Sequence, residues 1–186
     1  ACAATPETPV AESPVAITLT GPATTDNYNV SYVPGELTIT ASEAMTVSAT
    51  AYSGTYDAET HDSVVSALPS VPGATITYST DGGQNYTSTM PTITNAGEQL
   101  IYVKASAENY QDAVITVTAQ VAKAALRLTA DNKSRAYGQP NPPLTYSASG
   151  LKGNDTLDGI GLTDSVQIAC AATPETPVAE SPVAIT

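Results

Sequence analysis

The first 18 residues of the chain are identical to the last 18. Ala1–Thr18 and Ala169–Thr186 both read ACAATPETPVAESPVAIT, and the second copy starts 168 residues after the first (169 − 1 = 168). Identity over this length is not a chance event, so we interpret it as one full period of a tandem array followed by the start of the next copy. The alternative is an artificial duplication of one segment. A period of this length is too long for a solenoid unit and fits a string of small globular modules. We expect the chain to be an excerpt of that array.

Most of the sequence between the two copies alternates apolar and polar residues, which is typical of a strand with one buried face. From Ala113 to Val121 every odd position is apolar, and polar residues fill the even positions from 116 to 120. Turn signals such as Asp81-Gly82-Gly83 separate the strand patterns at short intervals. The same pattern predicts strands in the ranges 45–51, 75–78, 99–105 and 126–130. The sequence therefore predicts an all-β fold with small Ig-like or β-grasp-like modules.

The composition argues against several classes of function. The chain has Lys+Arg 6 against Asp+Glu 18, a formal net charge of -12, and both nucleic acid and anionic lipid need cations on the protein. No apolar run approaches the ~20 residues of a membrane-spanning helix. A single His and two Cys make a metal or catalytic cluster hard to assemble. We expect no enzyme activity, no cofactor, no nucleic acid partner and no insertion into a membrane.

Three groups of residues are candidate sites: the two cysteines, His61, and Asp81 with Asn85. Cys2 and Cys170 occupy the same position in successive copies, so one Cys per period cannot form a disulfide within a module. Each is either a free thiol that packs as a small hydrophobe or one half of a lateral disulfide to a neighbouring chain. His61 has flanking carboxylates but lacks further His or Cys ligands, and we interpret its segment as a solvated loop. Asp81 and Asn85 lack the spacing of a calcium-binding loop.

Three blocks of sequence resemble the YGX-type MBG domain of bacterial surface proteins. The run 126–146 contains Tyr137-Gly138 ahead of a proline-rich stretch and resembles the opening of that domain, and 149–157 resembles its next block. The closing block resembles 27–40, at the other end of the chain, where Pro34-Gly35 predicts a tight turn between strands over 28–33 and 36–40. The motifs are specific to architecture and carry no catalytic residues.

The residues between these blocks resemble a bacterial Ig-like repeat. The likeness extends from Ala51 to Lys123, and its markers are Ile76–Gly83, Pro91–Gly97 and Tyr102–Ala105. The two resemblances together imply three parts. Residues 1–41 are the C-terminal half of an MBG module begun in the preceding copy, 42–123 are an Ig-like repeat, and 124–186 are the N-terminal half of the next MBG module.

The resemblance thus implies one module split across the repeat boundary. Each half alone exposes strand edges and an unfilled apolar face. We expect residues 1–40 of one copy to complete residues 124–168 of the preceding copy; the alternative is closure within one chain, with 1–40 folding back onto 124–168. The residues expected to make this completion are Tyr28, Val30, Tyr32, Leu37, Ile39, Leu126, Leu128, Tyr146 and Ile168.

The family likeness also implies a function and a location. We expect a structural repeat of an extracellular bacterial surface fibre or adhesin stalk, whose partners are neighbouring copies of the same repeat and which assembles end to end. The alternative is an adhesive module that binds mucin or another host glycan. Aromatic faces for stacking on sugars would then come from Tyr52, Tyr56, Tyr86 and Tyr110.

Overall fold

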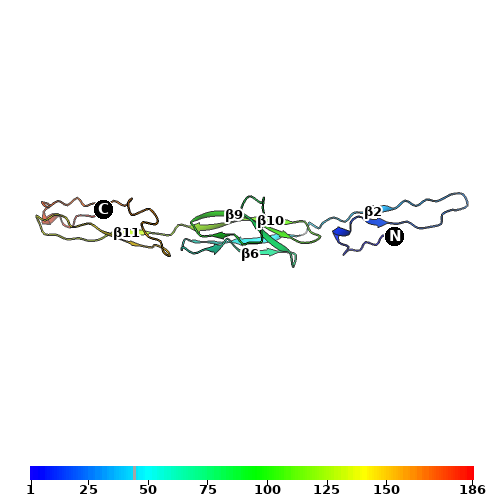
Figure 1. Cartoon of the computed structure of the whole chain (residues 1–186), viewed down its shortest axis with the longest axis horizontal. Coiled ribbons are helices and arrows are strands. Elements are labelled where there is room, and N and C mark those ends of the chain that lie inside the picture. The colour runs from blue at the N-terminus through cyan, green and yellow to red at the C-terminus, as the bar shows by residue number, and fades with distance from the viewer. Residues whose placement is uncertain (44) are drawn as a thin grey trace. The chain divides into compact units, whose positions relative to one another are not determined.

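The computed structural model describes residues 1–43 and 45–186, and strands predominate in them (Figure 1). The helical elements described there are two single 3-10 turns, η1 (Val10–Glu12) and η2 (Val178–Glu180). The prediction of an all-β fold is confirmed. Within the same residues, no helix has the length and apolar character needed to cross a membrane.

The chain divides into two compact units, which are described separately. The first unit contains Ala1–Ala51, Asp62–Pro91 and Gln99–Ala119. The second contains Tyr52–His61, Thr92–Glu98 and Gln120–Thr186. The module boundaries expected from sequence, at residues 41/42 and 123/124, remain predictions.

The largest sheet described has the strand order β4-β10-β9-β7. Its strands are β4 (Ser53–Thr55), β7 (Thr75–Ser79), β9 (Gly97–Ser106) and β10 (Ala113–Ala122). β7 runs antiparallel to β9, and β4 runs parallel to the end of β10. Two further strand pairs are described: β3 (Val47–Ala51) runs antiparallel to β6 (Val64–Pro69), and β5 (His61–Asp62) pairs with β8 (Thr92–Ile93).

Period-2 alternation explains where the core lies. On β9, Ile101, Val103 and Ala105 are fully buried, while the residues between them lie on the other face. On β10 the odd positions lie inward, ending with Ala119 and Val121, as the sequence predicts. The other buried hydrophobic residues described are Met45 and Val64. The core therefore lies within residues 45–121, which fall inside the range 42–123 expected for the Ig-like module.

The residues on either side of this core have short strand pairs and no core of their own. Near the N-terminus, β1 (Val15–Ile17) pairs antiparallel with β2 (Gly35–Leu37). Near the C-terminus, β11 (Arg127–Ala130) pairs antiparallel with β12 (Tyr146–Ser149). Of the residues that the structure describes, none in 1–43 or 122–186 is buried. Both flanks therefore expose large apolar side chains, among them Leu19, Tyr28 and Val178, and the division into half-modules stays a prediction.

Most of the predicted strands are present, and one hairpin is not. The patterns in 45–51, 75–78, 99–105, 113–121 and 126–130 correspond to β3, β7, β9, β10 and β11. The expected hairpin around Pro34-Gly35 is wrong: β2 begins at Gly35 and pairs with β1, and 28–33 is not a strand. Pro34 has no N–H to contribute to a ladder. Tyr32 instead donates its hydroxyl to the Pro22 carbonyl at 3.1 Å, within a loop that leads into β2.

Candidate functional site

The two copies of the 18-residue segment adopt the same local structure. In each copy the Thr-Pro-Glu-Thr turn closes with an N–H···O=C bond, of 3.1 Å from Thr8 to Thr5 and of 3.0 Å from Thr176 to Thr173. Each copy then forms a 3-10 turn, η1 in the first and η2 in the second. In each copy the cysteine and the isoleucine form an isolated antiparallel β-bridge, Cys2 with Ile17 and Cys170 with Ile185. A comparison of the two copies therefore shows how the contacts of one sequence differ when different residues lie next to it.

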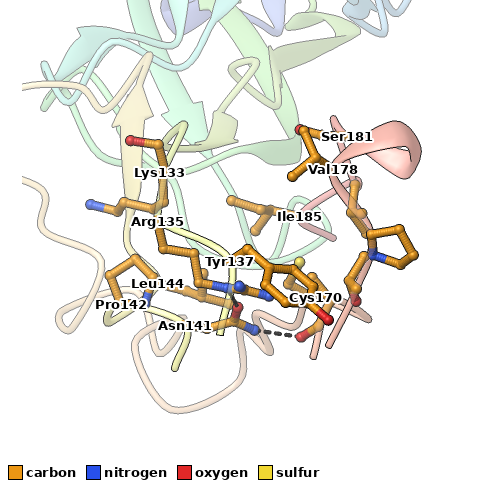
Figure 2. Close-up of a pocket in the computed structure, with 15 residues that line it drawn as sticks. Lys133, Arg135, Tyr137, Asn141, Pro142, Leu144, Cys170, Val178, Ser181 and Ile185 are labelled. Carbon is orange, nitrogen blue, oxygen red and sulfur yellow. Dashed lines mark hydrogen bonds between the residues drawn. The ribbon is translucent and has the colours of Figure 1, made fainter. Parts of the chain in front are cut away.

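The second copy packs against the loop that follows β11. Asn141 donates its side-chain amide to the Ala172 carbonyl at 2.7 Å (Figure 2). The Arg135 guanidinium donates to the Thr173 carbonyl. Gly138 N–H donates to the Pro174 carbonyl at 3.0 Å. These bonds join residues before position 168 to residues after it. The repeated segment thus belongs structurally with the residues that precede the repeat boundary.

A cavity of about 220 Å³ lies between that loop and the second copy. Tyr137, Leu144, Cys170, Val183 and Ile185 give it an apolar lining. Figure 2 shows its 15 lining residues, and none of them is acidic. We call this cavity the boundary groove; its full lining is Lys133, Ser134, Arg135, Tyr137, Asn141, Pro142, Leu144, Cys170, Ala172, Thr176, Pro177, Val178, Ser181, Val183 and Ile185.

The first copy shows what can pair with this strand. There, Val15 is opposite Leu37 and Ile17 is opposite Gly35 in the β1–β2 ladder. Just beyond β2, Ile39 N–H donates to the Ser13 hydroxyl at 2.8 Å. The second-copy counterparts of the three residues contacted are Ser181, Val183 and Ile185, and all three line the boundary groove. In the second copy the chain ends at Thr186, before any counterpart of β2.

The comparison with family models agrees with this arrangement. Residues 126–185 match the model of the MBG domain (YGX type). That family consists of repeats of bacterial surface proteins. The resemblance drawn from the sequence is confirmed for this range, and the matched range includes residues on both sides of position 168. No curated protein and no solved structure showed significant similarity to the chain.

The residues expected to complete the MBG domain lie on both flanks. Leu37 is 40% exposed on β2, Tyr28 is 74% exposed in the preceding loop, and Ile39 is half-buried beside Ser13. On the other flank, Leu128 and Tyr146 belong to the β11–β12 ladder. The remaining members are Tyr32, which is 40% exposed, and the half-buried Val30, Leu126 and Ile168. Their role in completion remains a prediction.

The two cysteines have different surroundings in spite of identical local sequence. Cys2 is exposed, whereas Cys170 is half-buried in the boundary groove, and both are free thiols in the structure. The position of Cys170 among Tyr137, Leu144 and Ile185 suits a small hydrophobic side chain. A lateral disulfide remains a prediction.

Contacts within the second unit join residues 52–61 to residues 150–158, which lie in the range that matches the MBG model. Tyr56 donates its hydroxyl to Asp155 Oδ2 at 3.0 Å, and this hydrogen bond is the main reason that the pKa of Tyr56 is raised. Ala58 has a φ of 70° and lies so close to Gly153 that a Cβ at position 153 would come within 2.7 Å of the Ala58 Cβ. Gly153 itself has a φ of 50°. Glycine is required there by both the conformation and the close approach.

His61 does not lie in the solvated loop expected from the sequence. It is half-buried on β5, with its ring stacked on Tyr52 at a centroid distance of 4.3 Å and an interplanar angle of 11°. Its Nε2 lies 3.1 Å from both carboxylate oxygens of Asp57. Glu59 N–H and then His61 stabilise the charged form of Asp57 and lower its pKa. The imidazole ring of His61 therefore has a structural role, which the alternation of apolar and polar residues in the sequence does not predict.

The Asp81 carboxylate organises the turn after β7. It accepts hydrogen bonds from the Ser79 hydroxyl at 2.6 Å, from Gln84 and Asn85 N–H groups, and from the Asn85 side chain. The Asn85 N–H and the Ser79 hydroxyl are the leading reasons that its pKa is lowered. Among the described residues no three His, Cys, Asp or Glu side chains gather in a way that could hold a metal ion. The turn therefore uses its carboxylate to satisfy its own donors.

The four tyrosines considered for sugar stacking are all half-buried. Tyr52 stacks on His61, Tyr56 bonds Asp155, and the Tyr86 ring lies 4.6 Å below the Lys104 ammonium. Tyr110 forms a backbone β-bridge with Ser42. The side chains of Tyr52, Tyr56 and Tyr86 are therefore each engaged in an intramolecular contact.

Proposed function

We propose that this chain is a structural repeat of an extracellular bacterial surface fibre or adhesin stalk, in which each MBG domain is completed across the repeat boundary. Residues 1–40 of one copy would complete residues 124–168 of the preceding copy. The observation that carries the proposal is the match over 126–185, which includes the first 17 residues of the repeated segment (185 − 168 = 17) together with the loop and strands before it.

The strand register supports a specific form of completion. Val183 corresponds to Val15, so a counterpart of Leu37 would lie opposite Val183 in an antiparallel ladder. Side chains of directly paired residues lie on the same face of a sheet, and residues two apart share that face. Counterparts of Leu37 and Ile39 would therefore lie on the Val183 face, which lines the boundary groove. Glycine opposite Ile185 adds no side chain there.

The net charge and the burial pattern support a repeat whose function is to lengthen a fibre or stalk. A net charge of -12 without a compensating basic cluster keeps a long array soluble and opposes its collapse. The absence of buried residues from the described parts of both flanks means that single copies expose apolar surface which tandem copies would cover. A protein made of such repeats gains order as copies are added in sequence.

The test is to extend the chain by 22 residues (40 − 18 = 22), placing a copy of residues 19–40 directly after Thr186. We expect amide exchange in Val183–Ile185 to slow by about tenfold or more, because a ladder forms on this strand. The matched control carries Leu37→Asp and Ile39→Asp in the added copy only, and we expect it to restore fast exchange. Closure within one chain predicts no effect of the extension, because the groove would already be filled by residues 1–40.

The mechanical role has its own test. A chain of several repeats, imaged by electron microscopy, should show a regular axial repeat, and it should bind neither mucin nor a panel of glycans. Glycan binding without an axial repeat would favour the adhesive alternative. Unchanged exchange in the extended chain, together with irregular images, would refute the proposal.

A further inference from the structure

Identical side chains in the two copies of the repeated segment differ in burial. Pro9 and Val10 are half-buried, whereas their counterparts Pro177 and Val178 are exposed, with Val178 75% exposed. The sequence and the local backbone are the same in both copies, so the difference comes from a neighbour that one copy has and the other lacks. This surface lies at the 3-10 turn, on residues other than those that pair with β2.

The neighbour of the first copy is the loop between β9 and β10. Asn109 Oδ1 accepts a hydrogen bond from Val10 N–H at 2.8 Å, between residues 99 positions apart that both belong to the first unit. The corresponding N–H of Val178 has no partner among the described residues, and η2 has no side-chain cap. One asparagine therefore distinguishes the environments of the two copies.

The loop holds Asn109 in a conformation that is uncommon for residues with a side chain. Its φ is 66°, in the left-handed region that asparagine tolerates better than most residues. Ser42 fixes the backbone on both sides: Ser42 N–H donates to the Asn109 carbonyl, and Gln111 N–H donates to the Ser42 carbonyl, both at 2.8 Å. Such conformations persist where the surrounding structure enforces them, often at functional contacts. The loop is a preformed projection whose amide oxygen meets the repeated segment.

We propose that Pro177 and Val178 form a docking surface for the Ig-like repeat of the following copy. The occupant is the counterpart of the loop 107–111, whose asparagine would accept the hydrogen bond of Val178 N–H. This inference rests on the proposed function, because it requires tandem copies, but it concerns other residues of the repeated segment. Pro177 and Val178 belong to the lining of the boundary groove, and they do not include Ser181, Val183 and Ile185, which would contact the counterparts of residues 35–39.

The connection between the MBG domain and the following Ig-like repeat would then be held by a hydrogen bond in addition to the covalent linker. The MBG domain and the following Ig-like repeat would be linked covalently near residues 40–42 and bonded again at Val178. The second attachment lies beside the first, because Ser42 of the linker is hydrogen-bonded to the Asn109 backbone, and it restricts the bending that a single short linker permits. The interface therefore adds stiffness at every repeat boundary.

The test compares the 186-residue chain with a two-repeat chain, in which a copy of residues 19–123 follows Thr186. Valine amides labelled with ¹⁵N report chemical shift and hydrogen exchange at Val10 and Val178. In the 186-residue chain we expect Val178 to exchange about tenfold faster than Val10, as one lost hydrogen bond implies. In the two-repeat chain we expect the shift and the exchange rate of Val178 to become those of Val10.

Asn109→Gly gives the matched variant, because glycine accepts the positive φ and removes only the side-chain amide. Placed in the second repeat, it should release Val178 and leave Val10 protected; placed in the first repeat, it should do the reverse. If Val178 stays fast while Val183–Ile185 gain protection, the docking inference is overturned and the completion of the MBG domain stands. If neither gains protection, both are overturned.

Discussion

Replacing Ile101 by alanine tests the assignment of the core directly. Ile101 is 0% exposed on β9, in the interior of the sheet, with β7 on one side and β10 on the other. Alanine lacks three of its carbon atoms, and each buried methylene contributes about 0.8 kcal/mol, which gives about 2.4 kcal/mol for transfer alone. The residual cavity adds to this loss, and measured costs for such substitutions are about 2–5 kcal/mol. We expect Ile101→Ala to lower the free energy of unfolding of this region by about 3–4 kcal/mol.

Leu100→Ala is the matched control. Leu100 is the preceding residue of the same strand, points to the opposite face and is 49% exposed. It loses the same number of carbon atoms, but about half of that surface is already in water, so we expect a cost of about 1 kcal/mol. The assay is urea denaturation followed by hydrogen exchange of β9 and β10 amides, which separates this core from the flanks. Equal costs for the two substitutions, or a larger cost for Leu100→Ala, would refute the assignment of the buried face.

Three further predictions concern particular side chains. The pKa of Asp81 is lowered in the folded state, so the contribution of its carboxylate to stability is fully present above about pH 4. That contribution is lost as the pH falls through the lower pKa of the folded state. Asp81→Asn should therefore make the melting temperature fall less steeply below about pH 4. Parallel melting curves would contradict this. Asp155→Asn should lower the raised pKa of Tyr56, measured by ¹³C NMR of the tyrosine ring, and Asp57→Asn should lower it less. An equal or larger effect of Asp57→Asn would count against the hydrogen bond assigned between Tyr56 and Asp155. A thiol reagent should label Cys2 faster than Cys170, with Cys2→Ser and Cys170→Ser assigning the two rates, and equal rates would contradict the difference in burial.

The sequence alone predicts the strands that have a continuous alternation of apolar and polar residues. The alternation in 113–121 predicts both β10 and its buried face, because side chains of a strand alternate regardless of the partner. The pairing of β1 with β2 was missed because Val15–Ile17 is short and its partner lies 18 or more residues away in sequence. The turn signal at Pro34-Gly35 predicts a local hairpin, but proline fixes a negative φ, whereas the tight turns that hairpins favour have a positive φ at the first central position.

The candidate site was predictable in outline and not in detail. The family resemblance indicated residues that the family model matches, 126–185, whereas the split module and the roles of Leu37 and Ile39 stay predictions. The resemblance could not place Arg135 and Asn141, which hold the second copy through its backbone carbonyls. Nor could it find Asn109, whose effect depends on a left-handed backbone conformation and on Ser42, 67 positions earlier (109 − 42 = 67). Side-chain bonds to distant carbonyls leave no periodic signal in a sequence.

Because β2 follows the repeated segment instead of lying within it, the borders of the sequence period differ from the borders of the folded parts. Under the proposed completion, a fragment cut from residue 1 to residue 168 would separate the completing strand from the domain it completes. A fragment that begins at residue 42 and ends at the following copy's equivalent of residue 40 would keep both together. An unequal crossover between the identical stretches of such a gene would add or remove one whole period, and each groove would still be followed by its completing strand.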